Sequence, residues 1–477
     1  MAYRDLRAYL EAVEARGLLH RVRVEVDPIL EIAALSDRMV KSGGPALFFE
    51  KVRGSRYPVV TNLFGSEELV KLALEVDDLK EPARRLEEAL SLPARGGLKT
   101  GLAALARLVE AGRWLPKRVK KAPCQEVVLD PPSLDELPVL QLWPQDAGRF
   151  ITLPLVFTRN PETGQQNMGM YRMQVFNSLT TGMHWHPTKD GARHYRLADK
   201  KLEVAVALGA DPAIIYAATA PLPPEFDEML LAGFLRREGV EMTRALTVDL
   251  EVPAQAEFIL EGYVEIGEKL LEGPFGDHTG YYSAPDYYPV FHLTCMTARR
   301  DAIYPATVVG VPPMEDAFLG RVTEHLFLPL IRLQLPEIKD IHFPVAGVFH
   351  NCAIISIEKS YPGQARKVMY ACWGLGQLMA TKFIIVVDAD VNIRDPEELW
   401  WRVWGNVDPR RDTVIVEGPL DALDHSSPHP GYGSKMGIDA TRKWREEGHP
   451  RPWPDEARPD DKTLALIARR WKEYGFK

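Results

Sequence analysis

Residues 257–266 read EFILEGYVEI and residues 288–296 read YPVFHLTCM, and these two stretches set the character of the middle of the chain. Between about residues 123 and 300 the hydrophobic period is alternating rather than helical. Short strands separated by Pro, Gly and Asn turns, with one helix at 225–237, predict an antiparallel barrel or sandwich. Further strand-like segments here are EVVLD (126–130), FITLPLVFT (150–158), MYRMQVF (170–176) and EVAVALG (203–209).

On both sides of this region the pattern is mixed α/β. Near the N-terminus a helix with one apolar face precedes a half-buried strand through Val22, Val24 and Val26, and residues 77–121 have the spacing of further helices. Towards the C-terminus KFIIVVDAD (382–390) is the continuous apolar run of a parallel strand covered on both faces. The apolar face of the N-terminal helix consists of Leu6, Tyr9, Leu10 and Val13. The predicted fold class is mixed α/β, with an N-terminal α/β domain (1–121), a central β domain (122–315) and a C-terminal α/β domain (316–477).

The end of the chain predicts an amphipathic terminal helix. Leu464, Ile467, Trp471 and Tyr474 form a single stripe. Such a helix docks either on a neighbouring subunit or on its own domain, and the sequence leaves both open.

Composition narrows the class of protein. The chain has 477 residues, 46% of them hydrophobic and 26% charged, which excludes a disordered or fibrous chain. Its net charge of 58 − 66 = −8 argues against a general nucleic-acid or acidic-membrane binder. The Cys residues form no C-x-x-C pair, and there is neither an N-terminal signal segment nor an apolar stretch of ~20 residues. We expect a cytoplasmic protein.

Two polar segments fall in the central region. NMGMYRMQ (167–174) reads as a regular strand that carries Arg172 among methionines, and a buried guanidinium needs an acidic or phosphate partner. The alternative is an arginine that reaches solvent at the sheet edge. GMHWHPTKDGARHYR (182–196) combines histidines, aromatics and basic residues, which suits a phosphate, a flavin-like ring or a metal ion. A polar surface loop is equally compatible with it.

Acidic groups complete the pattern. Glu272 and Asp277 flank the turn Gly-Pro-Phe-Gly, which brings two carboxylates towards one cavity if the turn is sharp; paired acids near an arginine can hold one carboxyl protonated as a general acid. Asp227 and Glu228 open a helix, where acids usually complement the helix dipole. VDADVNIRD (387–395) favours turn and helix-capping roles over nucleotide binding, and HPGYGSKMGIDAT (429–441) favours a loop over a phosphate contact through Lys435.

Taken together, these segments resemble the UbiD family of decarboxylases, which use prenylated FMN. The similarity runs in order along nearly the whole chain. Its segments are NMGMYRMQ, GMHWHP, VALGADPA, DLEVPAQAEFILEG, EGPFGDHTGYY, KFIIVVDADVNIRD and GSKMGIDATRKW. The resemblance implies that the central domain is a flavin-reductase-like split β-barrel, and that the chain forms a homodimer or homohexamer with the last helix reaching across.

The resemblance also assigns roles to residues. Arg172, Glu272 and Asp277 match the catalytic network, in which the arginine holds the substrate carboxylate and orients Glu272 while Asp277 delivers the proton that replaces CO₂. Asn167 and Glu228 match ligands of Mn²⁺ or Mg²⁺; His186 is the candidate third ligand, because Thr188 stands near the place where other members have histidine. A K⁺ site is usual in the family. The cofactor-binding residues implied are Met170, Tyr171, Arg172, His184, Trp185, His186, Lys189, Asp190 and Lys435.

The implied function is non-oxidative decarboxylation of a hydroxybenzoate-type acid, with or without a polyprenyl chain, in ubiquinone biosynthesis. A flavin prenyltransferase supplies the cofactor, and membrane contact arises only through a lipidic substrate. Three alternatives stay open: a menaquinone-pathway or other aromatic or α,β-unsaturated acid (de)carboxylase, an FMN-dependent reductase, and a non-catalytic flavin-binding subunit. The reductase has no need of Arg172, Glu272 and Asp277 together.

Overall fold

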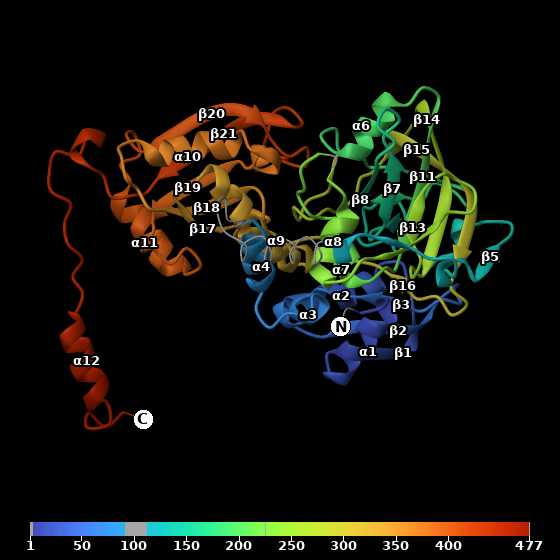
Figure 1. Cartoon of the computed structure of the whole chain (residues 1–477), viewed down its shortest axis with the longest axis horizontal. Coiled ribbons are helices and arrows are strands. Elements are labelled where there is room, and N and C mark those ends of the chain that lie inside the picture. The colour runs from blue at the N-terminus through green and yellow to red at the C-terminus, as the bar shows by residue number, and fades with distance from the viewer. Residues whose placement is uncertain (1–2, 91–111, 225, 477) are drawn as a thin grey trace, which may run out of the picture.

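The computed structural model describes residues 3–90, 112–224 and 226–476, and it confirms the mixed α/β class. In Figure 1 a C-terminal α/β lobe and a central β-rich lobe lie on either side of α9 (Glu315–Gln334), with the N-terminal elements below the central lobe. At 1.5 Å per residue this helix is ~30 Å long, so it can connect the lobes by itself. Its Glu315 accepts a hydrogen bond from Phe64 N near its start, and Arg332 near its end donates to Ile338 O.

The N-terminal elements surround a four-stranded sheet ordered β1-β2-β3-β16. As predicted, α1 buries Leu6, Tyr9, Leu10 and Val13, and Asp5 caps it. The prediction for Val24 is wrong, because that side chain is 68% exposed at the solvent face of β1. The elements are α1 (Leu6–Ala15), β1 (Leu19–Val26), α2 (Glu31–Lys41), β2 (Ala46–Val52), β3 (Val59–Thr61), α3 (Glu67–Ala73), α4 (Glu81–Leu90) and, from later in the chain, β16 (Tyr304–Pro305).

The predicted helices of residues 77–121 are present in part. Helix α4 lies in this range, and residues 91–111 lie outside the described residues. Lys117 and Arg118 form a short strand, β4, rather than a helix, because they pair with β12 (Glu241–Arg244). Strand β16 comes from the predicted central domain but joins the N-terminal sheet, and β4 comes from the predicted N-terminal domain but joins a central sheet. The sheets therefore cross the predicted domain boundaries, and these boundaries stay a prediction.

The central strands form an antiparallel seven-stranded sheet ordered β10-β15-β14-β11-β7-β8, with β5 on β15. Its core includes Phe258, Leu260 and Phe291, which are fully buried and contribute about 1.5–3 kcal/mol each. The strands of this sheet are β5 (Val127–Leu129), β7 (Leu155–Arg159), β8 (Gln166–Met170), β10 (Thr180–Gly182), β11 (Lys201–Leu208), β14 (Phe258–Glu272) and β15 (Asp286–Ala298). The other central elements are η1 (Pro123–Gln125), η2 (Leu134–Glu136), β6 (Phe150–Ile151), β9 (Met173–Gln174), α6 (Asp190–Leu197), α7 (Pro212–Ala217), α8 (Glu228–Arg236) and β13 (Glu251–Pro253).

The predicted regular strand over residues 167–174 is interrupted. Strand β8 ends at Met170, and β9 begins at Met173 and pairs with β6 instead of continuing the large sheet. Tyr171 and Arg172 therefore lie at the break between two sheets, where strand alternation no longer dictates the direction of a side chain.

The C-terminal sheet has the order β17-β18-β19-β21-β20, with a parallel centre and an antiparallel strand at each edge. Asp395 caps α11 by accepting from Glu397 N and Glu398 N, which confirms the capping role. The Gly-rich segment expected as a loop forms strand β21. The elements are β17 (Ile338–His342), η3 (Val345–Gly347), β18 (Cys352–Ile357), α10 (Gln364–Trp373), η4 (Gly376–Ala380), β19 (Phe383–Asp388), α11 (Pro396–Asn406), β20 (Thr413–Pro419), β21 (Tyr432–Asp439) and η5 (Arg445–Glu447).

The last helix, α12 (Asp461–Arg470), stands apart from both lobes at the lower left of Figure 1. None of its described residues is buried, and Leu464 and Trp471 are 50% and 44% exposed. The alternative in which this helix packs on its own domain is therefore wrong. Among the described helices, none has both the length and the apolar character to cross a membrane.

Candidate active site

Arg172 contacts both carboxylates that the sequence singles out. Its Nη2 lies 2.8 Å and its Nε 3.0 Å from Glu272 Oε1, while its Nη1 donates to Asp277 Oδ2. Nη2 also reaches Ser283 Oγ at 3.2 Å, and the guanidinium lies 4.8 Å from the centre of the Phe275 ring. The side chains of Arg172, Glu272 and Asp277 are only 9%, 0% and 9% exposed. The three groups thus form one buried ion-pair network.

Local chain geometry explains this meeting. Glu272 is the last residue of β14, and Gly273 follows it with φ +91°, a conformation that glycine adopts at little cost. The chain then turns so that Asp277 returns to the same guanidinium. The sharp turn expected between the two acids is therefore present.

Both carboxyls are ionised in this arrangement. Burial by itself raises the pKa of Glu272, but the hydrogen bond from His184 and the charge of Arg172 outweigh it, so the net shift is downward. The pKa of Asp277 is likewise lowered, because Arg172 and His278 outweigh its burial. The expectation that the site holds one carboxyl protonated is wrong for this state, since the arginine contacts both acids. If Asp277 donates a proton in catalysis, a neighbouring group must therefore first protonate its carboxylate.

His184 orients Glu272 from the other side. Its Nδ1 lies 3.2 Å and 3.1 Å from the two carboxylate oxygens, and its ring stacks on Tyr288 at 4.2 Å. Burial, with the negative charge of Glu272, raises the pKa of Tyr288 to about 12, so this phenol keeps its proton. The Glu272 carboxylate is held by four polar contacts, two from Arg172 and two from His184, and has little freedom to rotate.

Asn167 and Glu228, the predicted metal ligands, are in direct contact. Asn167 Nδ2 donates to Glu228 Oε1 at 2.5 Å, and Met168 N donates to Oε2 at 2.9 Å. The helix cap at this end of α8 is Asp227, whose side chain accepts from Met229 N at 2.8 Å. Glu228 is 7% exposed in the first turn of α8 and also contacts the β8 backbone, so its side chain does more than complement the helix dipole, whereas Asp227 acts as the cap.

This pair fits a hard divalent cation. Burial raises the pKa of Glu228 to about 8, and a cation bound beside this carboxylate would oppose that shift. Within the described part of the chain, Asn167 Oδ1 is buried and has no hydrogen-bond partner. An amide oxygen and a carboxylate are the ligands that Mg²⁺ and Mn²⁺ prefer. His186 bonds Thr188 Oγ1 through Nδ1 at 2.8 Å, which leaves Nε2 as its coordinating atom, and its role as third ligand stays a prediction.

Of the remaining predicted cofactor residues, Tyr171, Lys189 and Asp190 lie close enough to Glu228 to interact with its charge. Trp185 and Tyr171 are buried, and a Cβ at Gly191 would come within 2.5 Å of Trp185 Nε1, so the first turn of α6 packs closely on that indole. Lys189 precedes Asp190 at the start of α6, and burial lowers the pKa of its ammonium against the opposing charge of Asp190. Met170 is half-buried at the end of β8.

Lys435 is bound within its own domain. It lies on β21 and is 2% exposed, and its ammonium donates to Met379 O and, at 3.2 Å, to Thr381 O. Burial lowers its pKa to about 8. Its predicted contact with the cofactor stays a prediction.

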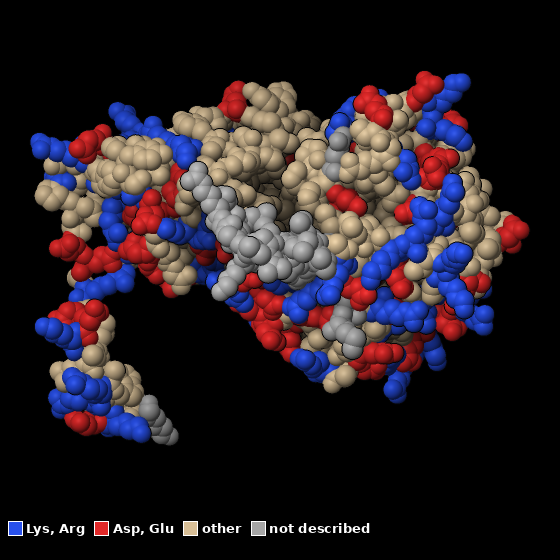
Figure 2. Space-filling model, in the orientation of Figure 1, with Lys and Arg blue, Asp and Glu red and all other residues tan. Residues whose placement is uncertain are grey.

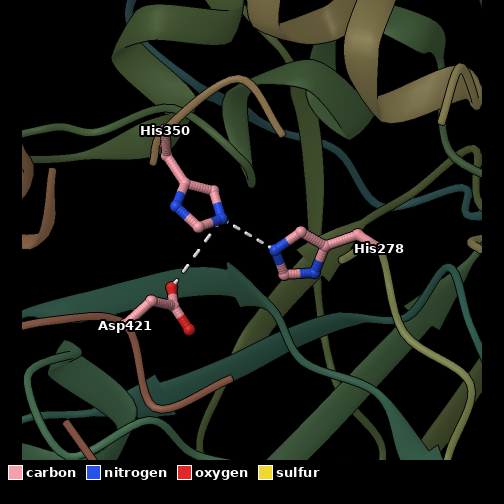
Figure 3. Close-up of side chains that lie close together, drawn as sticks. All are labelled: His278, His350 and Asp421. Carbon is pink, nitrogen blue, oxygen red and sulfur yellow. Dashed lines mark hydrogen bonds and ion pairs between the residues drawn. The ribbon is translucent and has the colours of Figure 1, made fainter. Parts of the chain in front are cut away.

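Three residues outside the predicted set of site residues also reach the network. His278 links Asp277 to His350, and Asp421 lies beside them; Figure 3 shows the three side chains converging. The only signal in the sequence is the position of His278 directly after Asp277.

Figure 2 shows the surface hollowed between the two lobes, with visible walls that are mostly uncharged.

Three protein-family models match the chain in order. They are the 3-octaprenyl-4-hydroxybenzoate carboxy-lyase N-terminal domain over residues 10–90, the Rift-related domain over 117–312 and the C-terminal domain over 317–440. The matches cover most of the chain and include every residue of the buried network. The protein is a carboxy-lyase. The chain belongs to the UbiD family, as its sequence pattern predicts.

Relatives of known sequence and structure agree with this. A protein of Archaeoglobus fulgidus, described as uncharacterized, is 54% identical over 478 residues, which cover 99% of each chain. The vanillic acid decarboxylase of Sedimentibacter hydroxybenzoicus in its closed form has 29% identity and a TM-score of 0.87, covering 99% of this chain and 100% of that one. HmfF of Pelotomaculum thermopropionicum in complex with FMN has 31% identity and a TM-score of 0.79, covering 97% and 99%; an evolved dimeric form of it holds prFMN.

Proposed function

We propose that this carboxy-lyase removes CO₂ without oxidation from a hydroxybenzoate-type aromatic acid, with prenylated FMN and a divalent metal ion in its central domain. One observation carries the proposal: a buried guanidinium meets two carboxylates, Glu272 and Asp277, beside a second polar group made of Asn167 and Glu228. A flavin reductase transfers hydride and has no use for such a network. The flavin in the related HmfF structures supports the cofactor assignment.

Arg172, Glu272 and Asp277 have separate roles in the proposed reaction. When bound, prenylated FMN supplies the electron sink for the pair that CO₂ leaves on carbon. Arg172 holds the substrate carboxylate, and Glu272, fixed by His184, keeps the guanidinium in place. Asp277, once protonated, gives its proton to the carbon that has lost CO₂. General acid catalysis of this kind is worth about 10²- to 10⁴-fold in rate.

Asn167 and Glu228, with His186 as third ligand, would hold Mn²⁺ or Mg²⁺, which would supply positive charge to balance a flavin phosphate. The buried amide oxygen and the raised pKa of Glu228 support this assignment. The K⁺ ion usual in the family is part of the same proposal. Met170, Tyr171, Trp185, Lys189, Asp190 and Lys435 are the proposed cofactor contacts.

The substrate assignment draws on the cleft and on the relatives. Mostly uncharged walls suit an aromatic ring, with or without a lipid chain, and favour release of CO₂ from a charged group into apolar surroundings (Figure 2). The family models carry the name of a polyprenyl-hydroxybenzoate carboxy-lyase, and a neighbour is a vanillic acid decarboxylase. We therefore place the enzyme in quinone biosynthesis in the cytoplasm, as a homo-oligomer supplied by a flavin prenyltransferase.

The test is production of the protein together with a flavin prenyltransferase. We expect the purified enzyme to carry the mass and absorption spectrum of prenylated FMN with stoichiometric manganese or magnesium. It should release CO₂ from at least one of 4-hydroxybenzoic acid, its 3-polyprenyl derivative and vanillic acid. Unmodified FMN with nicotinamide-dependent reductase activity and no CO₂ release would refute the proposal.

A further inference from the structure

His278 connects the proposed proton donor to the C-terminal domain. Its Nδ1 and its backbone N lie 2.8 Å and 2.7 Å from Asp277 Oδ1. Its Nε2 lies 2.9 Å from Nε2 of His350, which follows η3. Asp421, which follows β20, places Oδ2 3.9 Å from the same nitrogen of His350. Figure 3 shows that the three side chains come from separate segments and point towards one another.

The spacing of the two histidines identifies a hydrogen bond. Two imidazole nitrogens on one tetrahedral zinc ion lie ~3.3 Å apart, because each is ~2.0–2.1 Å from the metal. The observed 2.9 Å is the ordinary length of a hydrogen bond from nitrogen. One of the two nitrogens therefore carries a hydrogen.

The electrostatics assign that hydrogen to His278. Burial lowers the pKa of His278, but the hydrogen bond and the charge of Asp277 outweigh it and raise the pKa to about 9. Burial and the neighbouring His278 lower the pKa of His350 to about 4. At neutral pH His278 is an imidazolium that donates from Nδ1 to Asp277 and from Nε2 to a neutral His350.

The proposed reaction needs such a group. Decarboxylation consumes one proton, which ends on the carbon that CO₂ leaves, yet Asp277 is ionised in this structure. Arg172, its other partner, does not give up a proton in proteins. His278 is in contact with Asp277 and holds a transferable proton on the correct atom.

We propose that His350 and Asp421 are positioning residues through which the C-terminal domain holds His278 charged and aimed, so that His278 re-protonates Asp277 in every turnover. The inference rests on the proposed function. The Asp277 O–H bond breaks as the new C–H bond forms. The His278 Nδ1–H bond then breaks as a new O–H bond forms on Asp277 Oδ1, and the neutral imidazole takes one proton from water.

The charged groups around the pair all favour this state. Asp277 faces His278 from its own turn, Asp316 from α9, and Asp421 from the C-terminal lobe. Asp424 acts on His350 but is itself paired with Lys382 at 2.8 Å. The C-terminal domain thus supplies both the acceptor for Nε2–H and a negative charge. Loss of either should weaken the proton source without touching the substrate.

The experiment combines titration with kinetics. His278 is titrated by NMR in ¹⁵N-histidine-labelled full-length protein, with its signal assigned by His278→Gln, in wild type and in His350→Leu, His350→Gln and Asp421→Asn. The same variants, loaded with prenylated FMN, give kcat and KM against pH with vanillic acid or another accepted acid. His425→Leu is the matched control, because His425 contacts the Tyr281 ring across the same pair of domains at 4.0 Å.

We expect His350→Leu and Asp421→Asn to lower the pKa of His278 and the basic limb of kcat by about one pH unit, with KM unchanged. At pH 9 the charged fraction of His278 should then fall from about one half to about one eleventh. The expected loss of kcat at this pH is therefore about fivefold. In His350→Gln the amide oxygen accepts from Nε2–H of His278 and should restore the basic limb of kcat. The His425→Leu control should behave as wild type.

Unshifted titration and unshifted pH limbs in His350→Leu and Asp421→Asn would overturn the inference. So would equal losses at all pH values in the Leu and Gln variants, which indicate a merely structural role, or stoichiometric zinc at the pair. If wild type decarboxylates none of the acids, the proposed function fails on its own, while the NMR titration still decides whether His350 and Asp421 hold the charge on His278.

Discussion

Replacement of Asp277 by asparagine tests the proton-donor assignment most directly. Asp277 Oδ1 accepts from the backbone N and Nδ1 of His278, and Oδ2 accepts from Arg172. An asparagine must turn its NH₂ towards one of these donors and cannot carry the proton to carbon. Because Arg172 keeps its contacts with Glu272, we expect a destabilisation of about 2 kcal/mol, the scale of one hydrogen bond to a charged group. The kcat should fall about 10²- to 10⁴-fold.

The assay separates these two effects. The Asp277→Asn enzyme, produced with a flavin prenyltransferase, is compared with wild type in CO₂ release, in flavin absorbance per chain and in urea unfolding. We expect full flavin content, since Asn167 and Glu228 are untouched. Asp286→Asn is the matched control, because Asp286 is an exposed acid at the start of β15 in the same hairpin, and it should keep wild-type values.

A rate within about threefold of wild type, with a confirmed substrate, would refute the assignment, because general acid catalysis contributes far more than that. The Asp277→Glu variant gives a second measure. It keeps an ionisable acid with one more methylene group and should retain more activity than Asp277→Asn. If the two variants are equally inactive, an ionisable acid at this position is not sufficient without the exact placement of the Asp277 carboxyl.

Three further predictions follow from the same geometry. Glu228→Gln removes the charged ligand, so metal content measured by mass spectrometry and flavin content should both fall to background; full retention of manganese would contradict the ligand role. Arg172→Met leaves two buried carboxylates without their arginine partner, so the free energy of unfolding in urea at pH 7 should fall by about 3–5 kcal/mol. The loss should be smaller at pH 4, where the carboxyls accept protons. An equal loss at both pH values would refute the ion-pair explanation. The folded pKa of His278 is about 9 against 6.5 unfolded, so its stabilisation is complete below pH 6.5 and is lost as pH rises through 9. The contribution of charged His278 to the free energy of unfolding is at most about 3 kcal/mol. A His278→Gln protein whose stability falls as steeply as that of wild type between pH 6.5 and 9 would exclude this contribution.

Local patterns in the sequence predict most elements correctly. The α1 face, the central strands and the Asp395 cap depend on neighbours within a few residues, which is where periodicity and capping act. The errors have tertiary causes. Val24 is exposed where the pairing of β1 with β2 is interrupted between Val22 and Glu25, and the strand through Arg172 breaks because its second half pairs with β6 in a different sheet.

The candidate site divides in the same way. Residue types and spacing pick out Arg172, Glu272 and Asp277, and the family resemblance gives them roles that stay proposals. Arg172 lies 100 residues before Glu272, and only the folded chain brings the two within 2.8 Å. His350 and Asp421 carry no local signal at all, since each is a single polar residue in a loop of another domain.

The sequence by itself determined the class of fold, most of the elements and the family, because side-chain periodicity and turn residues act over short range. Only the tertiary structure decided that one guanidinium serves both carboxylates and that a histidine from the C-terminal lobe meets His278. Such contacts depend on how strands pair and lobes pack across many residues, and no local pattern encodes that distance.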